Sequence, residues 1–179
     1  MIEKEFVIMK ILVCSDIHGS IGVARKIFDK FEEVKADKLL LLGDLLYHGP
    51  RNDLPSDYAP KEVIELLNSH KEDILAVRGN CDGEVDQMVL QFPIMAEYIY
   101  LVSGDTVIYA THGHHVSADN PPVFLPEGAV LLHGHTHVAV DEMRDGFRYM
   151  NPGSPAIPKN GTPPSYIIIE DGRCELISF

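Results

Sequence analysis

Short apolar runs alternate with amphipathic segments in the first half of the chain. The apolar runs each stop at a polar or glycine-containing cluster and occupy residues 10–15, 38–42 and 73–78. Continuous runs of this kind are typical of strands buried on both faces. Between them, residues 20–34 and 61–69 carry apolar side chains at helical spacing, and Pro60 suits the first turn of the second helix. The β-α-β-α-β order predicts right-handed crossovers and a parallel sheet.

The second half is rich in turn signals and poor in helical periodicity. Turn sequences at residues 103–105, 145–146 and 171–172 each separate two strand-like runs. The strand-like runs of this half occupy residues 97–102, 106–111, 129–133, 138–144, 147–150, 165–170 and 174–178. We therefore expect an α/β first half and a mostly antiparallel second half, which form two sheets packed face to face with helices outside.

Length and composition bound the domain organisation. The 179 residues are 45% hydrophobic, which suits one domain that buries about 70% of its unfolded surface. Met9 directly precedes the first apolar run, so we take residues 9–179 as a single domain and residues 1–8 as a candidate N-terminal extension. Residues 45–60 hold three prolines and predict a long loop, which in a compact domain is usually functional or mobile.

Charge and cysteine usage narrow the function classes. The net charge of −12 argues against sequence-independent binding to nucleic acid, which requires clustered Lys and Arg. No apolar stretch approaches the roughly 20 residues of a membrane span, so we expect no membrane partner. Cys14, Cys81 and Cys174 are odd in number and widely spaced, which favours reduced thiols in a cytoplasmic protein. The oligomeric state is left open, with a homo-oligomer as one alternative.

Polar clusters follow the apolar runs where strands are expected to end. Their side chains of metal-ligand type are Asp16, His18, Asp44, Asn80, His112, His135 and His137. Each cluster alone is weak evidence, because an Asp or His in such a place is more often a turn or surface residue. Six of the nine histidines, however, lie in two short clusters at residues 112–115 and 133–137. Open α/β sheets carry ligand sites at the carboxyl ends of their strands, so we expect one shared site.

The residue types indicate metal-assisted phosphoester hydrolysis. Two cations can hold a phosphoryl group and activate water, whose pKa falls toward about 7 on a metal. Asp44 is our choice for a bridging ligand, because a carboxylate has lone pairs for two cations and an imidazole for one. Nitrogen and oxygen ligands without thiolate favour Mn²⁺, Fe²⁺, Co²⁺, Ni²⁺ or Zn²⁺ over Mg²⁺ or Ca²⁺.

In order and spacing, these clusters resemble the calcineurin-like metallophosphoesterase superfamily. The motifs that carry the resemblance are Asp16-x-His18, Gly43-Asp44, Gly79-Asn80, His112 and Gly134-His135-x-His137. Within the superfamily the chain is most similar to the YfcE-type phosphodiesterases, as shown by the segments at residues 15–19, 48–52, 79–82, 111–114 and 151–155. The resemblance extends from Met9 to the C-terminus.

The resemblance implies a fold, a metal centre and an activity. The implied fold is a four-layer α-β-β-α sandwich of two mixed sheets. One metal would be held by Asp16, His18, Asp44 and His137, and the other by Asp44, Asn80, His112 and His135. Mn²⁺ is the first expectation for both. The implied activity is hydrolysis of small phosphodiesters by a metal-bridging hydroxide.

The general acid is left open at this point. Many superfamily members have His at the position of Cys81, so the candidates for catalytic roles are Asn80, Cys81 and His114. Arg51 or His48 on the long loop are candidates for contact with the substrate phosphate, against the alternative of ordinary exposed loop residues. The competing hypothesis is a catalytically weak scaffold that binds partner proteins, as the small subunit of the retromer coat does with the same fold.

Overall fold

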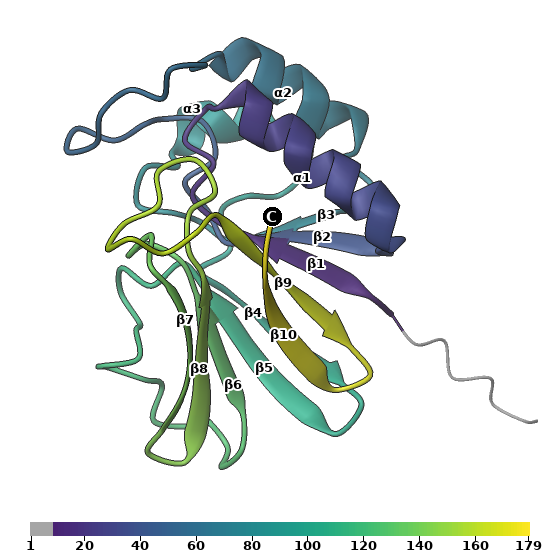
Figure 1. Cartoon of the computed structure of the whole chain (residues 1–179), viewed down its shortest axis with the longest axis vertical. Coiled ribbons are helices and arrows are strands. Elements are labelled where there is room, and N and C mark those ends of the chain that lie inside the picture. Colours follow the sequence, from purple (N-terminus) through teal and green to yellow (C-terminus); the bar gives the residue numbers. More distant parts are fainter. Residues whose placement is uncertain (1–8) are drawn as a thin grey trace, which may run out of the picture.

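The computed structural model describes residues 9–179, which form two five-stranded sheets packed face to face (Figure 1). The first sheet has the strand order β10-β9-β1-β2-β3, with β1 (Ile11–Cys14), β2 (Lys38–Leu41), β3 (Ile74–Ala76), β9 (Ser165–Glu170) and β10 (Arg173–Ser178). The second has the order β4-β5-β6-β8-β7, with β4 (Tyr98–Ser103), β5 (Thr106–Thr111), β6 (Val130–His133), β7 (Ala139–Arg144) and β8 (Phe147–Pro152). The candidate extension at residues 1–8 lies outside the described residues.

The first sheet confirms the predicted parallel β-α-β-α-β unit. Strand β2 pairs in parallel with both β1 and β3. Helices α1 (Ile21–Val34) and α2 (Pro60–Ser69) lie on its outer face, where Ala24 and Leu67 are fully buried against the sheet (Figure 1). Ser20 begins α1, since its side chain accepts a hydrogen bond from the Val23 N–H. The helical layer thus follows from the apolar stripes of these two segments.

The interface between the sheets is the second apolar core. Alternate residues of the central strands point into it, so that Val13 and Leu40 of the first sheet face Ile108 and Leu132 of the second. Ile167 on β9 is fully buried in the same core. The two sheets therefore share one side-chain layer, and the ends of their central strands are held at fixed separation.

The C-terminal hairpin does not belong with the rest of the second half. Strand β9 pairs antiparallel with β1, and β10 pairs with β9, so both join the first sheet. The second sheet also contains two parallel pairs, β5 with β6 and β6 with β8. The connection at residues 112–129 makes the first of these pairs possible, because parallel strands need a crossover of a dozen or more residues. Both sheets are thus mixed, as expected, but the halves of the chain do not correspond to the sheets.

The outer face of the second sheet is covered by irregular chain, where the expected four-layer α-β-β-α sandwich has a second helical layer; the connection at residues 112–129 covers this face instead. Leu131, Phe147 and Tyr149 form an apolar cluster with Ala118, against which Leu125 packs. Within residues 9–179, the helices are α1, α2 and the single-turn α3 (Glu84–Gln87), and none of them is both long and apolar enough to span a bilayer. Helix α3 was not predicted from the sequence, since four residues carry too little periodicity.

Ile167→Ala tests the shared core between the sheets. We expect the free energy of unfolding to fall by about 2–5 kcal/mol, because the substitution leaves a cavity in a fully buried layer. Chemical denaturation measures this change. Val102→Ala is the control, since Val102 is 69% exposed and its truncation should alter stability by less than about 0.5 kcal/mol. Equal effects of the two substitutions would contradict the packing described.

Candidate active site

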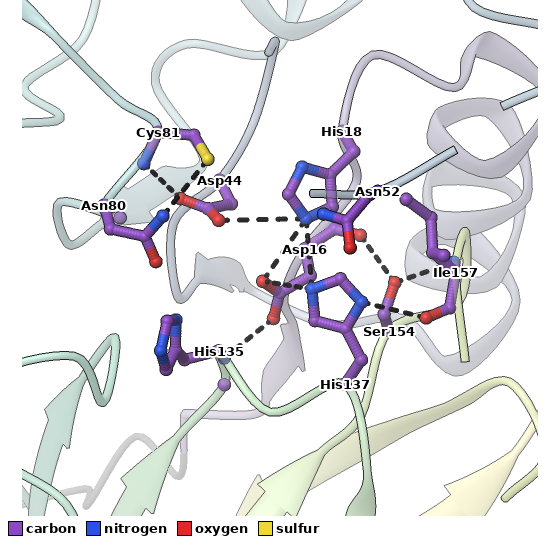
Figure 2. A network of polar contacts seen from close by, with 12 residues as sticks. Asp16, His18, Asp44, Asn52, Asn80, Cys81, His135, His137, Ser154 and Ile157 are labelled. Atoms are coloured by element: carbon purple, nitrogen blue, oxygen red, sulfur yellow. Dashed lines mark hydrogen bonds and ion pairs between the residues drawn. The ribbon is translucent and has the colours of Figure 1, made fainter. Parts of the chain in front are cut away.

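The polar clusters predicted from the sequence meet at one edge of the two sheets (Figure 2). Asp16 and His18 follow β1, Asp44 follows β2, and Asn80 with Cys81 follows β3. From the second sheet, the contributors follow β5 and β6: His112, His135 and His137. The structure thus brings all seven expected ligand residues to one place, from five separate loops.

One group is centred on Asp16, His18 and His137, whose side chains are fully or almost fully buried. Asp16 Oδ1 lies 3.6 Å from His18 Nε2 and 3.3 Å from His137 Nε2. The two imidazole nitrogens are 3.1 Å apart. The other carboxylate oxygen of Asp16 accepts the backbone N–H of residue 135, which links the two sheets.

The second group surrounds His112 and shares Asp44 with the first. Asp44 Oδ2 lies 3.7 Å from His18 Nε2 and 3.5 Å from His112 Nε2. His112 Nε2 is also 3.1 Å from the side-chain oxygen of Asn80. The His135 ring lies beside this group, with its centroid 5.1 Å from that of His112. Asp44 therefore stands between the two groups, as a bridging ligand must.

Each buried imidazole is oriented by a backbone carbonyl. His18 Nδ1 lies 2.7 Å from the carbonyl oxygen of Tyr47. His112 Nδ1 lies 2.6 Å from that of Leu42, and His137 Nδ1 lies 2.9 Å from that of Ile157. A carbonyl only accepts, so each Nδ1 carries a proton, and each ring in its neutral form has its Nε2 lone pair on the side of the carboxylates. This arrangement of a ring held through its outer nitrogen is typical of metal-binding histidines.

The donor set fits divalent cations. Lone pairs of Nε2 atoms face one another and face carboxylate oxygens, and Asp16 Oδ1 is a buried atom without a hydrogen-bond partner in the described part of the chain. A buried acceptor without a donor is costly unless a cation compensates it. These side chains therefore suit divalent cations, and Asp44 belongs to more than one of the groups of candidate ligands.

Electrostatics couple the two groups. Burial lowers the pKa of His112, but hydrogen bonding to Asp44 and the charge of Asp16 outweigh it and raise that pKa to about 9. Burial opposes ionisation of Asp16, yet its contacts with His137 and His18 hold its pKa well below the ordinary value. Without a bound metal, the site therefore keeps its carboxylates ionised and recruits protons onto histidine.

Several of these residues hold unusual backbone conformations. Asp16, His18, Asp44, His135 and His137 all have φ between 49 and 67°. Non-glycine residues adopt this left-handed region rarely and at a cost, and such conformations cluster at functional sites. Gly43 precedes Asp44 with φ 95°, and an added Cβ would lie 2.4 Å from the Gly79 nitrogen. These loops therefore keep unfavourable backbone conformations that direct the side chains into the site.

Asp82 is a structural part of the site that the sequence reasoning did not single out. It is almost fully buried, and its carboxylate accepts the backbone N–H groups of Gly79, Asp44 and Leu45 at 2.8–2.9 Å. Burial raises its pKa to about 6, against the lowering effect of those three donors. Asp82 thus fixes the loop that carries Asp44 to the loop that carries Asn80 and Cys81. Its place in the Gly-Asn-Cys-Asp segment was the available signal.

A pocket of about 320 Å³ opens beside the buried groups, and we call it the site pocket. Its lining residues are Asp44, Gly49, Pro50, Arg51, Asn52, Asn80, Cys81, His135, Thr136, His137 and Lys159. Arg51 therefore lies where a substrate phosphate contact was expected. Lys159, which the sequence reasoning missed, adds a second cationic side chain. His48 is not among the lining residues and packs instead between the rings of Tyr47 and Tyr58.

The candidate acids lie at different distances from this pocket. The His114 ring is 5.3 Å from that of His112, outside the lining of the site pocket. Burial and the neighbouring His112 lower the pKa of His114 to about 4. Cys81 lines the pocket, where burial and the Asp44 carboxylate raise the pKa of its thiol to about 12. At neutral pH the imidazole is therefore deprotonated and the thiol protonated, and neither is tuned as a strong acid.

Comparison with known proteins assigns the family. The calcineurin-like phosphoesterase superfamily domain matches residues 9–171. The chain belongs to this superfamily. Phosphodiesterase YfcE of Escherichia coli strain K12 is 44% identical over 170 residues, which cover 95% of this chain and 92% of that protein. The solved structure of the phosphoesterase YfcE from E. coli superposes with a TM-score of 0.91 and covers 95% of this chain and 93% of that one.

More distant relatives share the fold. Phosphodiesterase MJ0936 of Methanocaldococcus jannaschii is 29% identical over 151 residues, covering 81% of this chain and 83% of that protein. Vps29 from Entamoeba histolytica, at 21% identity, superposes with a TM-score of 0.62, covers 96% of this chain and 99% of that one, and shows the fold alone. The expected family and fold class are thus confirmed, and the chain is a phosphoesterase-type enzyme.

Asp82→Asn tests the role of the buried carboxylate. An amide cannot accept three N–H groups with its single oxygen, so we expect unfolding free energy to fall by about 1–3 kcal/mol. Affinity for divalent metal should fall at least tenfold, in the range of about 10–100-fold typical of residues that orient ligands. Asp86→Asn is the matched control, because the Asp86 carboxylate accepts a backbone N–H only at the start of α3. Indistinguishable metal affinities would remove Asp82 from this role.

Proposed function

We propose that this chain is a metal-dependent phosphodiesterase that hydrolyses small phosphodiesters at a centre for two divalent cations. The observation that carries the proposal is the convergence of three Nε2 lone pairs on two buried carboxylates, with every Nδ1 committed to a carbonyl. A structural role alone gives no reason to bury the Asp16 carboxylate oxygen Oδ1 without a donor among these imidazoles.

The geometry supports a division of the ligands between two metals. Asp16, His18, Asp44 and His137 would hold the first cation. Asp44, Asn80, His112 and His135 would hold the second. Cys81 lies near His18 and Asp44, but a thiol with a pKa of about 12 stays protonated and is a poor ligand. Nitrogen and oxygen ligation favours Mn²⁺, with Fe²⁺, Zn²⁺, Ni²⁺ and Co²⁺ as alternatives.

The remaining residues position the substrate. When bound, the two cations would supply Lewis acidity, a lowered pKa for water and compensation of phosphate charge. Arg51 and Lys159 line the site pocket and suit the non-bridging oxygens of a phosphodiester. Asn80 and Cys81 lie between the metal-ligand groups and the loop wall, where Asn80 can contact the phosphate as well as a cation. A pocket of this volume suits a small diester.

The scaffold hypothesis is the alternative, since Vps29 structures share the fold. A protein-binding platform does not require buried and strained ligand-type residues, whereas Asp16, His18, Asp44 and His137 are here both buried and held at positive φ. We also propose a cytoplasmic location, because the structure leaves Cys14, Cys81 and Cys174 unpaired. Hydrolysis of bis-p-nitrophenyl phosphate separates the two functions. No turnover by the wild type with Mn²⁺, Co²⁺, Ni²⁺ or Zn²⁺ would favour the scaffold.

Asp44→Asn tests the bridging ligand. The amide keeps the shape but loses the charge that two cations share, so metal content should fall from two per chain toward one or zero. Turnover of bis-p-nitrophenyl phosphate should fall by at least about 10³-fold, because removal of an essential group typically costs this much. Elemental analysis and the assay report the two quantities. Asp145→Asn, in an exposed turn, is the control, and an Asp44→Asn protein that keeps two metals would refute the bridge.

Metal binding should release a proton. In metal-stripped protein the pKa of His112 is about 9, so its imidazole is protonated at pH 7.5 and must become neutral to bind. Apparent metal affinity should therefore rise about tenfold for each pH unit from 7 to 8, and level off above about 9. Calorimetric titration at pH 7.5 in two buffers of different ionisation enthalpy measures the released proton. Equal enthalpies in both buffers would contradict the proposed ligation.

A leaving-group series separates the candidate acids. A positioned general acid contributes about 10²–10⁴-fold, and alkyl esters need it more than nitrophenyl esters do. If His114 supplies the proton, His114→Ala should slow alkyl esters much more than aryl esters. If the site lacks an acid, Cys81→His should improve alkyl esters selectively. Unchanged leaving-group dependence in both variants would exclude both residues. His115→Ala, on the exposed neighbour of His114, is the control.

A further inference from the structure

A second pocket adjoins the site pocket, and we call it the apolar pocket. Its volume is about 570 Å³, and its lining residues are Leu46, Tyr47, Tyr58, Pro60, Ile64, Asn80, Cys81, Asp82, Gly83, Val85, Asp86 and Val89. Asn80 and Cys81 line both pockets, so the two adjoin at the loop that follows β3. A molecule bound beside the metal-ligand groups can therefore extend from one pocket into the other.

One wall of the apolar pocket is aromatic and anchored. The His48 ring lies between Tyr47 and Tyr58, with centroid distances of 4.7 and 5.4 Å. The segment that carries Tyr58 is tied to the start of α1, because the Ser20 hydroxyl donates to Asp57 at 2.8 Å and the Ala59 N–H donates to the Gly19 carbonyl. The aromatic wall is thus preorganised rather than part of a free loop.

The part of the apolar pocket formed by α3 and the residues after it has exposed aliphatic side chains. Val85 and Val89 are 71% and 44% exposed, on and just after α3. The side chain of Gln87 fixes this turn through hydrogen bonds to the backbone of Leu90, Phe92 and Ile94. The turn therefore holds two exposed apolar side chains at the pocket that Tyr47 and Tyr58 also line. Apolar residues gathered in this way commonly mark a binding surface.

The charges of the two pockets differ in sign. The site pocket is lined by the cationic Arg51 and Lys159 together with the candidate metal ligand Asp44, whereas the charged residues that line the apolar pocket are Asp82 and Asp86. A phosphate anion is therefore attracted to the first and repelled from the second. The carboxylates disfavour an anion and the apolar side chains disfavour burial of any charge, so an uncharged group fits the apolar pocket best, and tyrosine walls favour a flat ring.

We propose that the apolar pocket binds an uncharged aromatic ester group of the substrate while the phosphate occupies the site pocket. This inference rests on the proposed phosphodiesterase function and names its substrate class: diesters with an aryl or heteroaromatic arm. Diesters with two small alkyl arms leave the apolar pocket unfilled. Diesters that carry a second anionic group meet the carboxylates of Asp82 and Asp86.

Two non-hydrolysable monoanions test the proposal without depending on which arm leaves. Monomethyl phenylphosphonate and monomethyl methylphosphonate carry the same charge and differ only in the ring. Calorimetry on the Mn²⁺-loaded protein measures both dissociation constants. We expect the phenyl compound to bind about tenfold more tightly, as partial burial of a ring at about 25 cal/mol per Å² gives. Tyr47→Ala and Val85→Ser should each reduce this ratio to about threefold or less.

Matched controls lie elsewhere on the surface. Tyr100→Ala and Val102→Ser remove side chains of the same type on β4, where Tyr100 is 46% and Val102 69% exposed, and should leave the ratio unchanged. Thermal unfolding of all four variants verifies that they are folded. A wild-type ratio near one, or a ratio unaffected by both apolar-pocket variants, overturns the inference. Failure of the proposed function is a separate result, namely no hydrolysis of bis-p-nitrophenyl phosphate by wild type with any tested metal.

Discussion

The arrangement of the site depends on two buried carboxylates, whose charges the surrounding residues must compensate. Asp16 and Asp44 both lie within 4 Å of the same nitrogen, His18 Nε2, and both are almost fully buried. Like charges this close in a low-dielectric interior require compensation, and the surrounding residues supply it. Histidines from both sheets face the carboxylates, and backbone N–H groups of Cys81 and residue 135 donate to them. The packing of the two sheets is what brings these partners into range.

The local elements of the fold were predictable because their signals are local. The strands β1, β2 and β3 each follow from a continuous apolar run, and helices α1 and α2 each follow from apolar side chains at helical spacing. Each of these patterns lies within a single segment. The place of β9 was not predictable in this way. Its residue Ile167 pairs with Val13 at the far end of the chain, and an apolar strand pattern does not specify its neighbour. Strand pairing depends on non-local packing, which a single sequence does not display.

The residues of the site also differ in whether the sequence could predict them. Residues adjoining strand ends, such as Asp16 and Asp44, could be proposed because topology places strand ends together. Lys159 could not, since it follows β8 in a loop without a motif and reaches the site through the turn beside His137. Asp82 was also missed: its place in the Gly-Asn-Cys-Asp segment was a signal, but the sequence does not show that its carboxylate accepts three backbone N–H groups. Ser154 is a similar case: its hydroxyl donates to the Asp16 carbonyl from the opposite end of the chain.

The left-handed backbone at five of the proposed ligands affects which substitutions are expected at these positions during evolution. Each non-glycine residue held in this region costs about 1 kcal/mol or more, which only the site geometry maintains. A lineage that stopped binding metal would be free to relax these positions, and glycine or asparagine would relieve the cost most directly. In members of this fold that have lost catalysis, we therefore expect Gly or Asn at the positions of Asp16, Asp44 and His137. Asp and His at these positions are the residues that the proposed metal centre requires.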